Sequence, residues 1–215
     1  MKQTLTTSSL IAEAKIFCAR KHAYKKLFGA TDGKAVGTFI EHEFQQHLES
    51  LYDVTIGSSA LGLDLPSIEA DIKVTSVRQP QSSCPFRSAR QKVYGLGYNL
   101  LVFVYDKHDE AKSKTAILQF VYCGFIDKSR TADYQTTRGI QEVLERDGNR
   151  DDIFAFLSER NLPVDDIGLN ALTDEIMSAP PKLGYLTISN ALQWRLQYGR
   201  VVNLNAEIDG IVKIV

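Results

Sequence analysis

Apolar residues recur every three to four positions along two stretches near the N-terminus, and this spacing predicts two helices. The first spans about residues 7–28, with an apolar face formed by Leu10, Ile11, Ala14, Phe17 and Cys18. The second spans about 34–52, with a buried stripe formed by Val36, Ile40, Phe44, Leu48 and Leu51. Between them, the Gly-Ala-Thr-Asp-Gly segment at 29–33 breaks the pattern.

The pattern then changes to a period of two, which is typical of a strand. Residues 62–76 predict a tight hairpin whose second strand alternates strictly. One face is apolar (Ile68, Ala70, Ile72, Val74), and the other is polar (Glu69, Asp71, Lys73, Thr75). Asp64 lies on the first strand of this predicted hairpin. The polar face of the second strand therefore carries two carboxylates and a lysine amine, and the first strand adds the carboxylate of Asp64 beside them.

Further along the chain, residues 98–105 are nearly all apolar, as in a strand covered on both faces, and 115–125 predict another strand. A short helix at 86–94 precedes them. These elements predict an α/β fold with a central mixed β-sheet of at least four strands flanked by helices. Beyond residue 127 we expect short helices at 139–146 and 153–160, a loop-rich stretch as far as 181, a helix at 188–198 and a final strand at 201–215.

A length of 215 residues is suited to one domain with a single core. We expect residues 1–126 to form a catalytic core and 127–215 to continue it as a specificity or dimerisation region. Lys and Arg total 25 against 26 Asp and Glu, so the net charge of -1 gives no global attraction to nucleic acid. Any binding to DNA must depend on local patches.

Three widely spaced cysteines (Cys18, Cys84 and Cys123) favour reduced thiols in a cytoplasmic protein over a disulfide scaffold. No apolar run is long enough to cross a bilayer or to form a signal peptide, so we expect no membrane partner.

The predicted hairpin offers a chemical site. Two carboxylates, Asp64 and Asp71, would meet beside the amine of Lys73. Carboxylates at that distance repel unless a cation separates them, and hard divalent cations prefer carboxylate oxygens. The alternative is a solvated strand face whose charges form ordinary cross-strand ion pairs.

Asp64 followed by Asp71-Ile72-Lys73 resembles the bipartite motif of the PD-(D/E)xK nuclease superfamily, which includes most type II restriction endonucleases. Gly62-Leu63 stands where that motif usually has Pro. The segment Gly37-Thr38-Phe39-Ile40-Glu41 resembles a Gly-x-x-x-Glu helix that supplies another acid in many relatives. The resemblance covers about residues 34–105 and implies a restriction-endonuclease-like fold.

The resemblance implies Asp64 and Asp71 as ligands of Mg2+, assisted by the Ile72 carbonyl and Glu41, with Lys73 as the catalytic lysine. On a helical wheel Glu43 lies nearer the apolar stripe than Glu41, so Glu43 remains the alternative for the auxiliary acid.

Residues 75–104 contain no acid, which predicts a basic surface suited to a polyanion. The candidate DNA contacts are Arg78, Gln81, Arg87, Arg90, Gln91 and Lys92. The alternative is a loop that lacks acids by chance.

Together these features predict a Mg2+-dependent type II restriction enzyme that cleaves double-stranded DNA as a homodimer. The alternatives are a junction-resolving or repair nuclease of the same superfamily, a non-catalytic DNA-binding protein with a degenerate nuclease fold, and an unrelated α/β protein.

Overall fold

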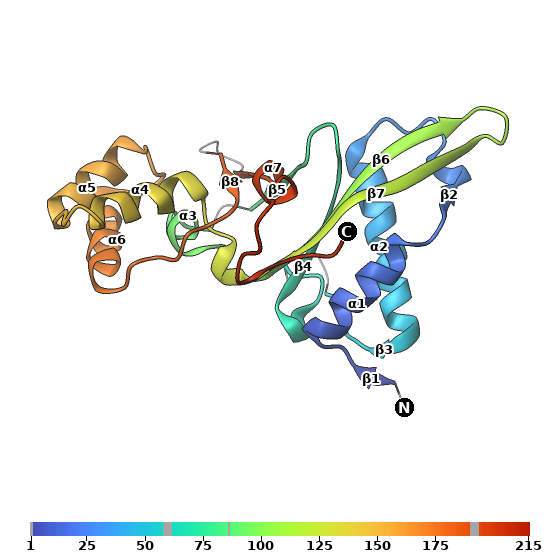
Figure 1. Cartoon of the computed structure of the whole chain (residues 1–215), viewed down its shortest axis with the longest axis horizontal. Helices are drawn as coiled ribbons and strands as arrows, with labels where there is room; N and C mark the ends of the chain where they lie inside the picture. Colours follow the sequence, from blue (N-terminus) through green and yellow to red (C-terminus); the bar gives the residue numbers. More distant parts are fainter. Residues whose placement is uncertain (1, 58–61, 86, 190–193) are drawn as a thin grey trace. The chain divides into compact units, whose positions relative to one another are not determined.

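The computed structural model describes residues 2–57, 62–85, 87–189 and 194–215. The chain divides into two compact units, and neither of them is continuous in sequence (Figure 1). The first unit comprises Met1–Pro80, Asn99–Ile126 and Glu207–Val215, and the second comprises Gln81–Tyr98 and Asp127–Ala206. This division differs from the predicted boundary at residue 126, because residues 81–98 belong to the second unit and residues 207–215 to the first. Whether the two units act as one domain stays a prediction.

The first unit is built on a five-stranded mixed sheet, which confirms the predicted α/β class. Its strand order is β10-β7-β6-β4, and β2 also pairs with β7. Strand β4 (Ala70–Ser76) runs parallel to β6 (Asn99–Glu110), while β6 and β7 (Thr115–Ile126) form a long antiparallel hairpin. Strands β2 (His22–Tyr24) and β10 (Ile211–Lys213) pair with different parts of β7. A separate parallel pair joins β1 (Gln3–Thr4) to β3 (Tyr52–Asp53).

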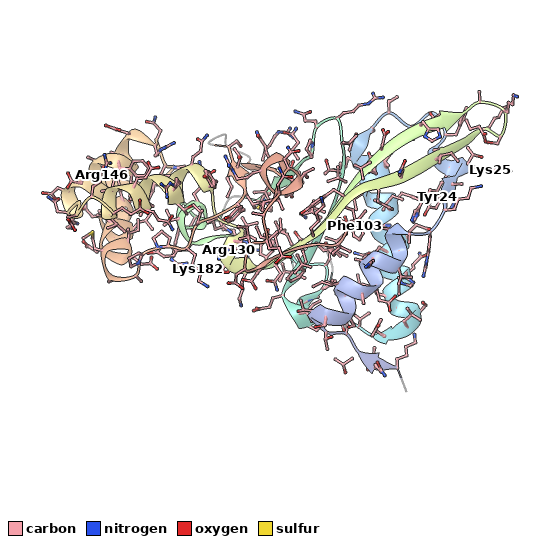
Figure 2. All side chains as sticks on the ribbon, in the orientation of Figure 1. Tyr24, Lys25, Phe103, Arg130, Arg146 and Lys182 are labelled. Atoms are coloured by element: carbon pink, nitrogen blue, oxygen red, sulfur yellow. The ribbon has the colours of Figure 1, made fainter. Side chains whose placement is uncertain are left out.

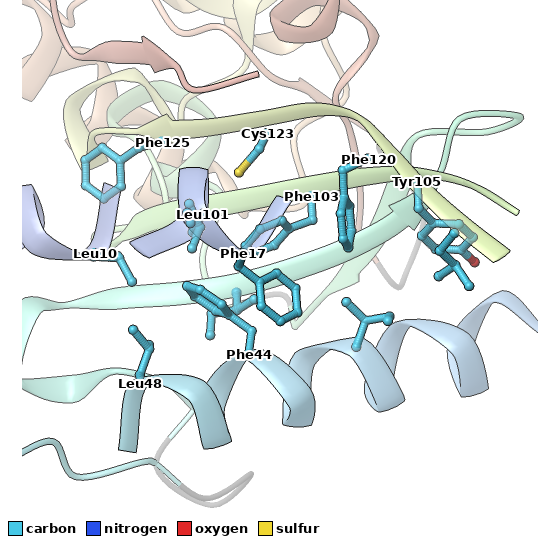
Figure 3. Close-up of a cluster of buried hydrophobic side chains, with 14 of the residues drawn as sticks. Leu10, Phe17, Phe44, Leu48, Leu101, Phe103, Tyr105, Phe120, Cys123 and Phe125 are labelled. Atoms are coloured by element: carbon cyan, nitrogen blue, oxygen red, sulfur yellow. The ribbon is translucent and has the colours of Figure 1, made fainter. Parts of the chain in front are cut away.

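Two helices of the first unit, α1 (Thr7–Cys18) and α2 (Gly33–Leu51), pack against this sheet. Aromatic rings fill the space between them, and Figure 3 shows Phe17, Phe44, Phe103 and Phe120 gathered there. The ring centroids of Phe44 and Phe103 lie 5.0 Å apart in an edge-to-face arrangement, which is favourable for aromatic pairs. Phe103 lies on the central strand β6, and Figure 2 labels it among the surrounding side chains.

Helix α2 lies unusually close to β4 at Gly37. A Cβ atom added at this glycine would stand 3.0 Å from the backbone oxygen of Val74. Four and eight residues further along the helix, Glu41 and Gln45 occupy the same face, because positions four apart are neighbours on a helix. Gly37 therefore allows the face that carries these two polar residues to lie against the strand that carries Asp71 and Lys73.

The predicted hairpin before β4 is much shorter than expected. Leu65 and Ala70 form a single bridge around a 3-10 turn at Pro66–Ile68, and Glu69 adopts a left-handed conformation with φ 49°. Asp64 therefore lies in a bend before this turn rather than on a strand. Strand β4 begins at Ala70, so the strict alternation predicted from Ile68 is wrong at its first two positions.

The second unit has helices packed around an apolar cluster, together with a small sheet. The helices are α3 (Arg90–Tyr94), α4 (Tyr134–Leu144), α5 (Arg150–Glu159) and α6 (Asp166–Ser178), and their buried residues include Val93, Ile140, Leu157 and Ile176. Strands β5 (Gln81–Cys84), β9 (Trp194–Gln197) and β8 (Thr187–Ile188) form a three-stranded antiparallel sheet. A short helix, α7 (Gly199–Val202), follows β9.

Several sequence predictions are wrong in detail. The first helix ends at Cys18 rather than near 28, because the following residues pair with β7 as β2. The predicted helix at 188–198 contains the last residue of β8 and all of β9, since tertiary pairing with β5 imposes an extended backbone. Residues 190–193 of this predicted helix lie outside the described part of the chain, as does residue 86 of the predicted helix at 86–94. Helix α6 occupies the stretch that we predicted as loop-rich, and the final strand is reduced to α7 and the short β10.

Within the described ranges, no helix is both long enough and apolar enough to pass through a membrane.

The close approach at Gly37 generates a stability prediction. Gly37→Ala should lower the free energy of unfolding by about 1–2 kcal/mol, because overpacking against a backbone oxygen outweighs the helix propensity gained by replacing glycine. The matched control is Gly33→Ala on the same helix, where an added Cβ would meet only the Tyr105 hydroxyl at 4.0 Å. Urea denaturation of both variants measures the difference. Equal stabilisation of the two variants would contradict the tight contact between α2 and β4.

His22 generates a pH prediction. Its Nε2 lies 2.8 Å from the Phe17 carbonyl oxygen, which can only accept, so Nε2 carries the proton and Nδ1 accepts from the Tyr24 hydroxyl at 2.8 Å. Burial lowers the pKa of His22 below its ordinary 6.5, although the Phe17 carbonyl opposes that shift. Below pH 6.5 the unfolded chain takes up a proton more readily than the folded chain, so this histidine lowers stability as the pH falls.

His22 by itself should therefore lower the free energy of unfolding between pH 7 and pH 5, by at most about 1.4 kcal/mol per pH unit, whereas the raised pKa values of Asp71 and Glu41 act in the opposite direction. His22→Gln should remove the His22 contribution from the measured slope while lowering stability overall. Replacement of the exposed His42 by Gln is the control and should leave the slope unchanged. An identical slope in wild type and His22→Gln, measured by urea denaturation across this range, would contradict the assignment.

Candidate active site

Three acids and one lysine of the first unit converge beside β4. Asp71 and Lys73 come from the strand itself, Asp64 from the bend before it, and Glu41 from the face of α2 that lies against it. The carboxyl of Asp64 lies close enough to both Glu41 and Asp71 to affect the pKa of each. The sequence-predicted set therefore comes together in space, even though Asp64 is not on a strand.

Asp64 is held from two sides. The backbone N–H of Ile72 donates to Asp64 Oδ2 at 2.7 Å, and the side-chain Nε2 of Gln45 donates to Oδ1 at 3.4 Å. The Asp64 carbonyl accepts a further hydrogen bond from the N–H of Gly57 at 2.8 Å. Backbone and side chain are thus both fixed, although the residue lies in irregular structure.

Asp71 and Lys73 form a close ion pair on one face of β4, with 2.6 Å between Lys73 Nζ and Asp71 Oδ2. The exposed fraction of the Asp71 side chain is 9% and that of Lys73 is 23%. The polar face of β4 is therefore largely withdrawn from water, in contrast to the solvated face that was the alternative interpretation.

The electrostatics of the cluster reflect an excess of acids. Burial, followed by the hydrogen bond with Asp64, raises the pKa of Asp71 to about 7, despite the opposing effect of Lys73. Burial also raises the pKa of Glu41, and the Asp71 charge adds to this shift while Lys73 opposes it. Burial alone would lower the pKa of Lys73, but the attraction of Asp71, Asp64 and Glu41 outweighs it and raises that pKa. Lys73 therefore remains an ammonium, and a single cation neutralises only part of the negative charge.

The donor chemistry suits a hard divalent cation. The N–H of Ile72 points to Asp64 and away from β6. In a strand the N–H and C=O of one residue point to the same side, so the Ile72 carbonyl also faces the side on which Asp64 lies. Carboxylate and carbonyl oxygens are the ligands that Mg2+ prefers. Within the described residues, however, no group of three or more His, Cys, Asp or Glu side chains is placed so as to hold a metal ion. Asp71 Oδ2 is bound by Lys73, so Lys73 would have to move if this oxygen became a ligand.

The two candidates for the auxiliary acid have different surroundings. Glu41 is affected by Lys73, Asp71 and Asp64, whereas Glu43 acts on His22 and Tyr24 of the β2 segment. Glu41, and not Glu43, therefore lies with the other acids.

The candidate DNA contacts are divided between the two units. Arg78 follows β4 in the first unit and is exposed, while the other five belong to the second unit. There, Arg87 is exposed, Gln81 is half-buried in β5, and Arg90 forms an ion pair with Glu175 at 2.5 Å.

Gln91 and Lys92 are buried, with exposed fractions of 8% and 5%. The Gln91 amide accepts from the Arg87 N–H at 3.2 Å and donates to the Leu96 carbonyl at 3.3 Å. Burial lowers the pKa of Lys92, although Asp133 opposes the shift. In this conformation neither side chain is available at the surface. A charge count along the sequence could not reveal this, because burial depends on the packing of α3.

One residue of the cluster was missed in the sequence. Gln45 is buried and contacts Asp64, yet it carries no charge and belongs to no part of the motif. Its position four residues after Glu41, on the same helix face, was the available signal.

Comparison with known proteins identifies the family to which this chain belongs. Residues 4–213 match the family model described as "Type II restriction enzyme NspV". The type II restriction enzyme NspV of Nostoc sp. is 53% identical to this chain over 212 residues, which are 98% of this chain and 96% of that protein. No solved structure matches the chain. A match over nearly the full length of both proteins shows that this chain belongs to the NspV family of type II restriction enzymes.

Proposed function

We propose that this enzyme is a Mg2+-dependent endonuclease that hydrolyses phosphodiester bonds of double-stranded DNA at a specific sequence. The observation that carries the proposal is the convergence of Asp64, Asp71, Glu41 and Lys73 beside β4. Membership in a family of type II restriction enzymes supports the same reaction and substrate.

In this proposal, Asp64, Asp71 and the Ile72 carbonyl hold the cation, with Glu41 as the auxiliary acid. Bound Mg2+ would lower the pKa of a water molecule and neutralise charge that develops on the phosphate during attack. The excess of acids in the cluster supports this role, because a divalent cation would relieve their mutual repulsion.

Lys73 is proposed to orient the attacking water and to contact a phosphate oxygen. The surrounding acids raise its pKa, so it remains protonated and acts as a donor rather than as a base. Water attack on phosphorus breaks one P–O ester bond, and the departing oxygen takes up a proton.

We further propose that the enzyme acts as a homodimer. A palindromic target has two-fold symmetry, and a two-fold protein dimer places one active site at each strand. Light scattering of the free protein and of the complex with DNA tests this point, and a monomer under both conditions would contradict it.

The active-site proposal predicts that Asp71→Asn lowers the rate of Mg2+-dependent plasmid cleavage by about a thousandfold or more, because a charged ligand is lost where transition-state charge must be stabilised. Binding of DNA should persist, as measured by a mobility shift. Asp53→Asn, at an exposed acid of β3 in the same unit, is the control and should cleave normally. Discrete bands from wild-type digestion indicate site-specific cutting, whereas cleavage confined to branched DNA would contradict sequence specificity. Full activity of Asp71→Asn would exclude Asp71 as a ligand.

Arg78 generates a separate prediction about DNA binding. In the Asp71→Asn background, Arg78→Ala should weaken binding to DNA of any sequence, and the slope of log K against log salt should decrease in magnitude by about 1, as for a lost phosphate contact. Lys15→Ala, at an exposed lysine of α1, is the control. Fluorescence anisotropy at several salt concentrations measures both quantities. An unchanged slope would exclude Arg78 from the interface.

A further inference from the structure

We infer that Gln45 is a positioning residue of the active site, which orients the Asp64 carboxylate for a divalent cation. This inference rests on the proposed function, since it concerns the same cluster of acids. It assigns a role to a neutral residue that lies outside the Asp64, Asp71 and Lys73 motif.

The contact itself has a defined chemical direction. A carboxylate only accepts hydrogen bonds, so the amide nitrogen of Gln45 must face Asp64, and Nε2 lies 3.4 Å from Oδ1. The other oxygen, Oδ2, accepts from the backbone N–H of Ile72 at 2.7 Å. Two donors on the two oxygens fix the rotation of the carboxyl group about its last bond. Each oxygen retains a lone pair that can bind a cation.

The position of Gln45 explains why a helix can reach Asp64. Gly37, Glu41 and Gln45 follow one another at intervals of four along α2, and Gly37 brings this face close to β4. Glu41, one turn earlier on the same helix face, also lies beside Asp64 and has its pKa affected by it. Of these two residues, only Gln45 donates a hydrogen bond to the Asp64 carboxylate.

The neutral character of Gln45 matters for the affinity of the site. An arginine or lysine at this position would also donate to Asp64, but its charge would compete with a metal cation for the same carboxylates. An amide donates without adding charge, so the negative potential of the cluster is kept. Gln45 is only 8% exposed, and a buried amide costs free energy unless its hydrogen bonds are made. The contact with Asp64 supplies such a bond.

The test compares Gln45→Met, which keeps the length of the side chain and removes the donor, with Gln46→Met at the exposed neighbouring position. Calorimetry with Mn2+ alone measures metal binding without DNA cleavage. We expect the dissociation constant of Gln45→Met to rise about tenfold, which is typical when an outer hydrogen-bond partner of a metal ligand is lost. Gln46→Met should bind as the wild type does. In cleavage assays the Mg2+ concentration for half-maximal rate should rise more than kcat falls.

The variant Asp64→Asn separates the role of Gln45 from the proposed metal site on which that role depends. Because Gln45 acts through Asp64, Gln45→Met should have no further effect on Mn2+ binding in the Asp64→Asn background. If Asp64→Asn weakens Mn2+ binding and Gln45→Met does not, the inference fails and the metal site stands. If Asp64→Asn also leaves binding unchanged, the proposed metal site fails, and the role of Gln45 with it. Gln45→Ala is measured in parallel, and circular dichroism confirms that each variant is folded.

Discussion

The candidate active site depends on how closely helix α2 approaches strand β4. That distance is set at Gly37, where an added Cβ would stand only 3.0 Å from the backbone oxygen of Val74. Beyond this contact the same face of the helix brings Glu41 and Gln45 to the bend that carries Asp64. A spacing wider by the size of one methyl group would move both residues away from the acids. The glycine and the two polar residues therefore work as one structural unit.

The cluster around β4 is electrostatically unbalanced, and this is a feature of sites that bind charged ligands. Asp71 is paired with a lysine and still has a raised pKa, since burial and neighbouring acids outweigh that lysine. In an ordinary structural ion pair the attraction would lower the pKa of the acid. An imbalance of this kind reduces the stability of the fold, and the surrounding aromatic core must compensate for it.

The sequence predicted the elements whose hydrophobic pattern is strong and local. The apolar stripe from Val36 to Leu48 indicated α2, because a helix buried on one face has apolar residues every three to four positions. The apolar run from Leu100 to Tyr105 indicated β6, because a strand buried on both faces is apolar at nearly every position. The meeting of Asp64, Asp71 and Lys73 was also foreseeable, since they lie within ten positions of one another. Glu41 came from the resemblance rather than from the pattern.

Features that depend on distant partners could not be predicted in this way. Trp194 and Leu196 were assigned to a helix, but pairing with β5 makes them a strand. The burial of Lys92 is decided by α3 and its neighbours, and no charge count reveals it. Helix α6 is a different case, because Leu169, Leu172 and Ile176 follow a helical period that could have been recognised.

The passage of the chain back and forth between the two units has an evolutionary consequence. Residues 81–98 leave the first unit and return to it, and the last nine residues come back to pair β10 with β7. No single cut or fusion point can separate one unit from the other. Exchange of the second unit between relatives would require two segments to be replaced together, so new variants of this enzyme are expected to arise by point substitution rather than by shuffling of whole modules.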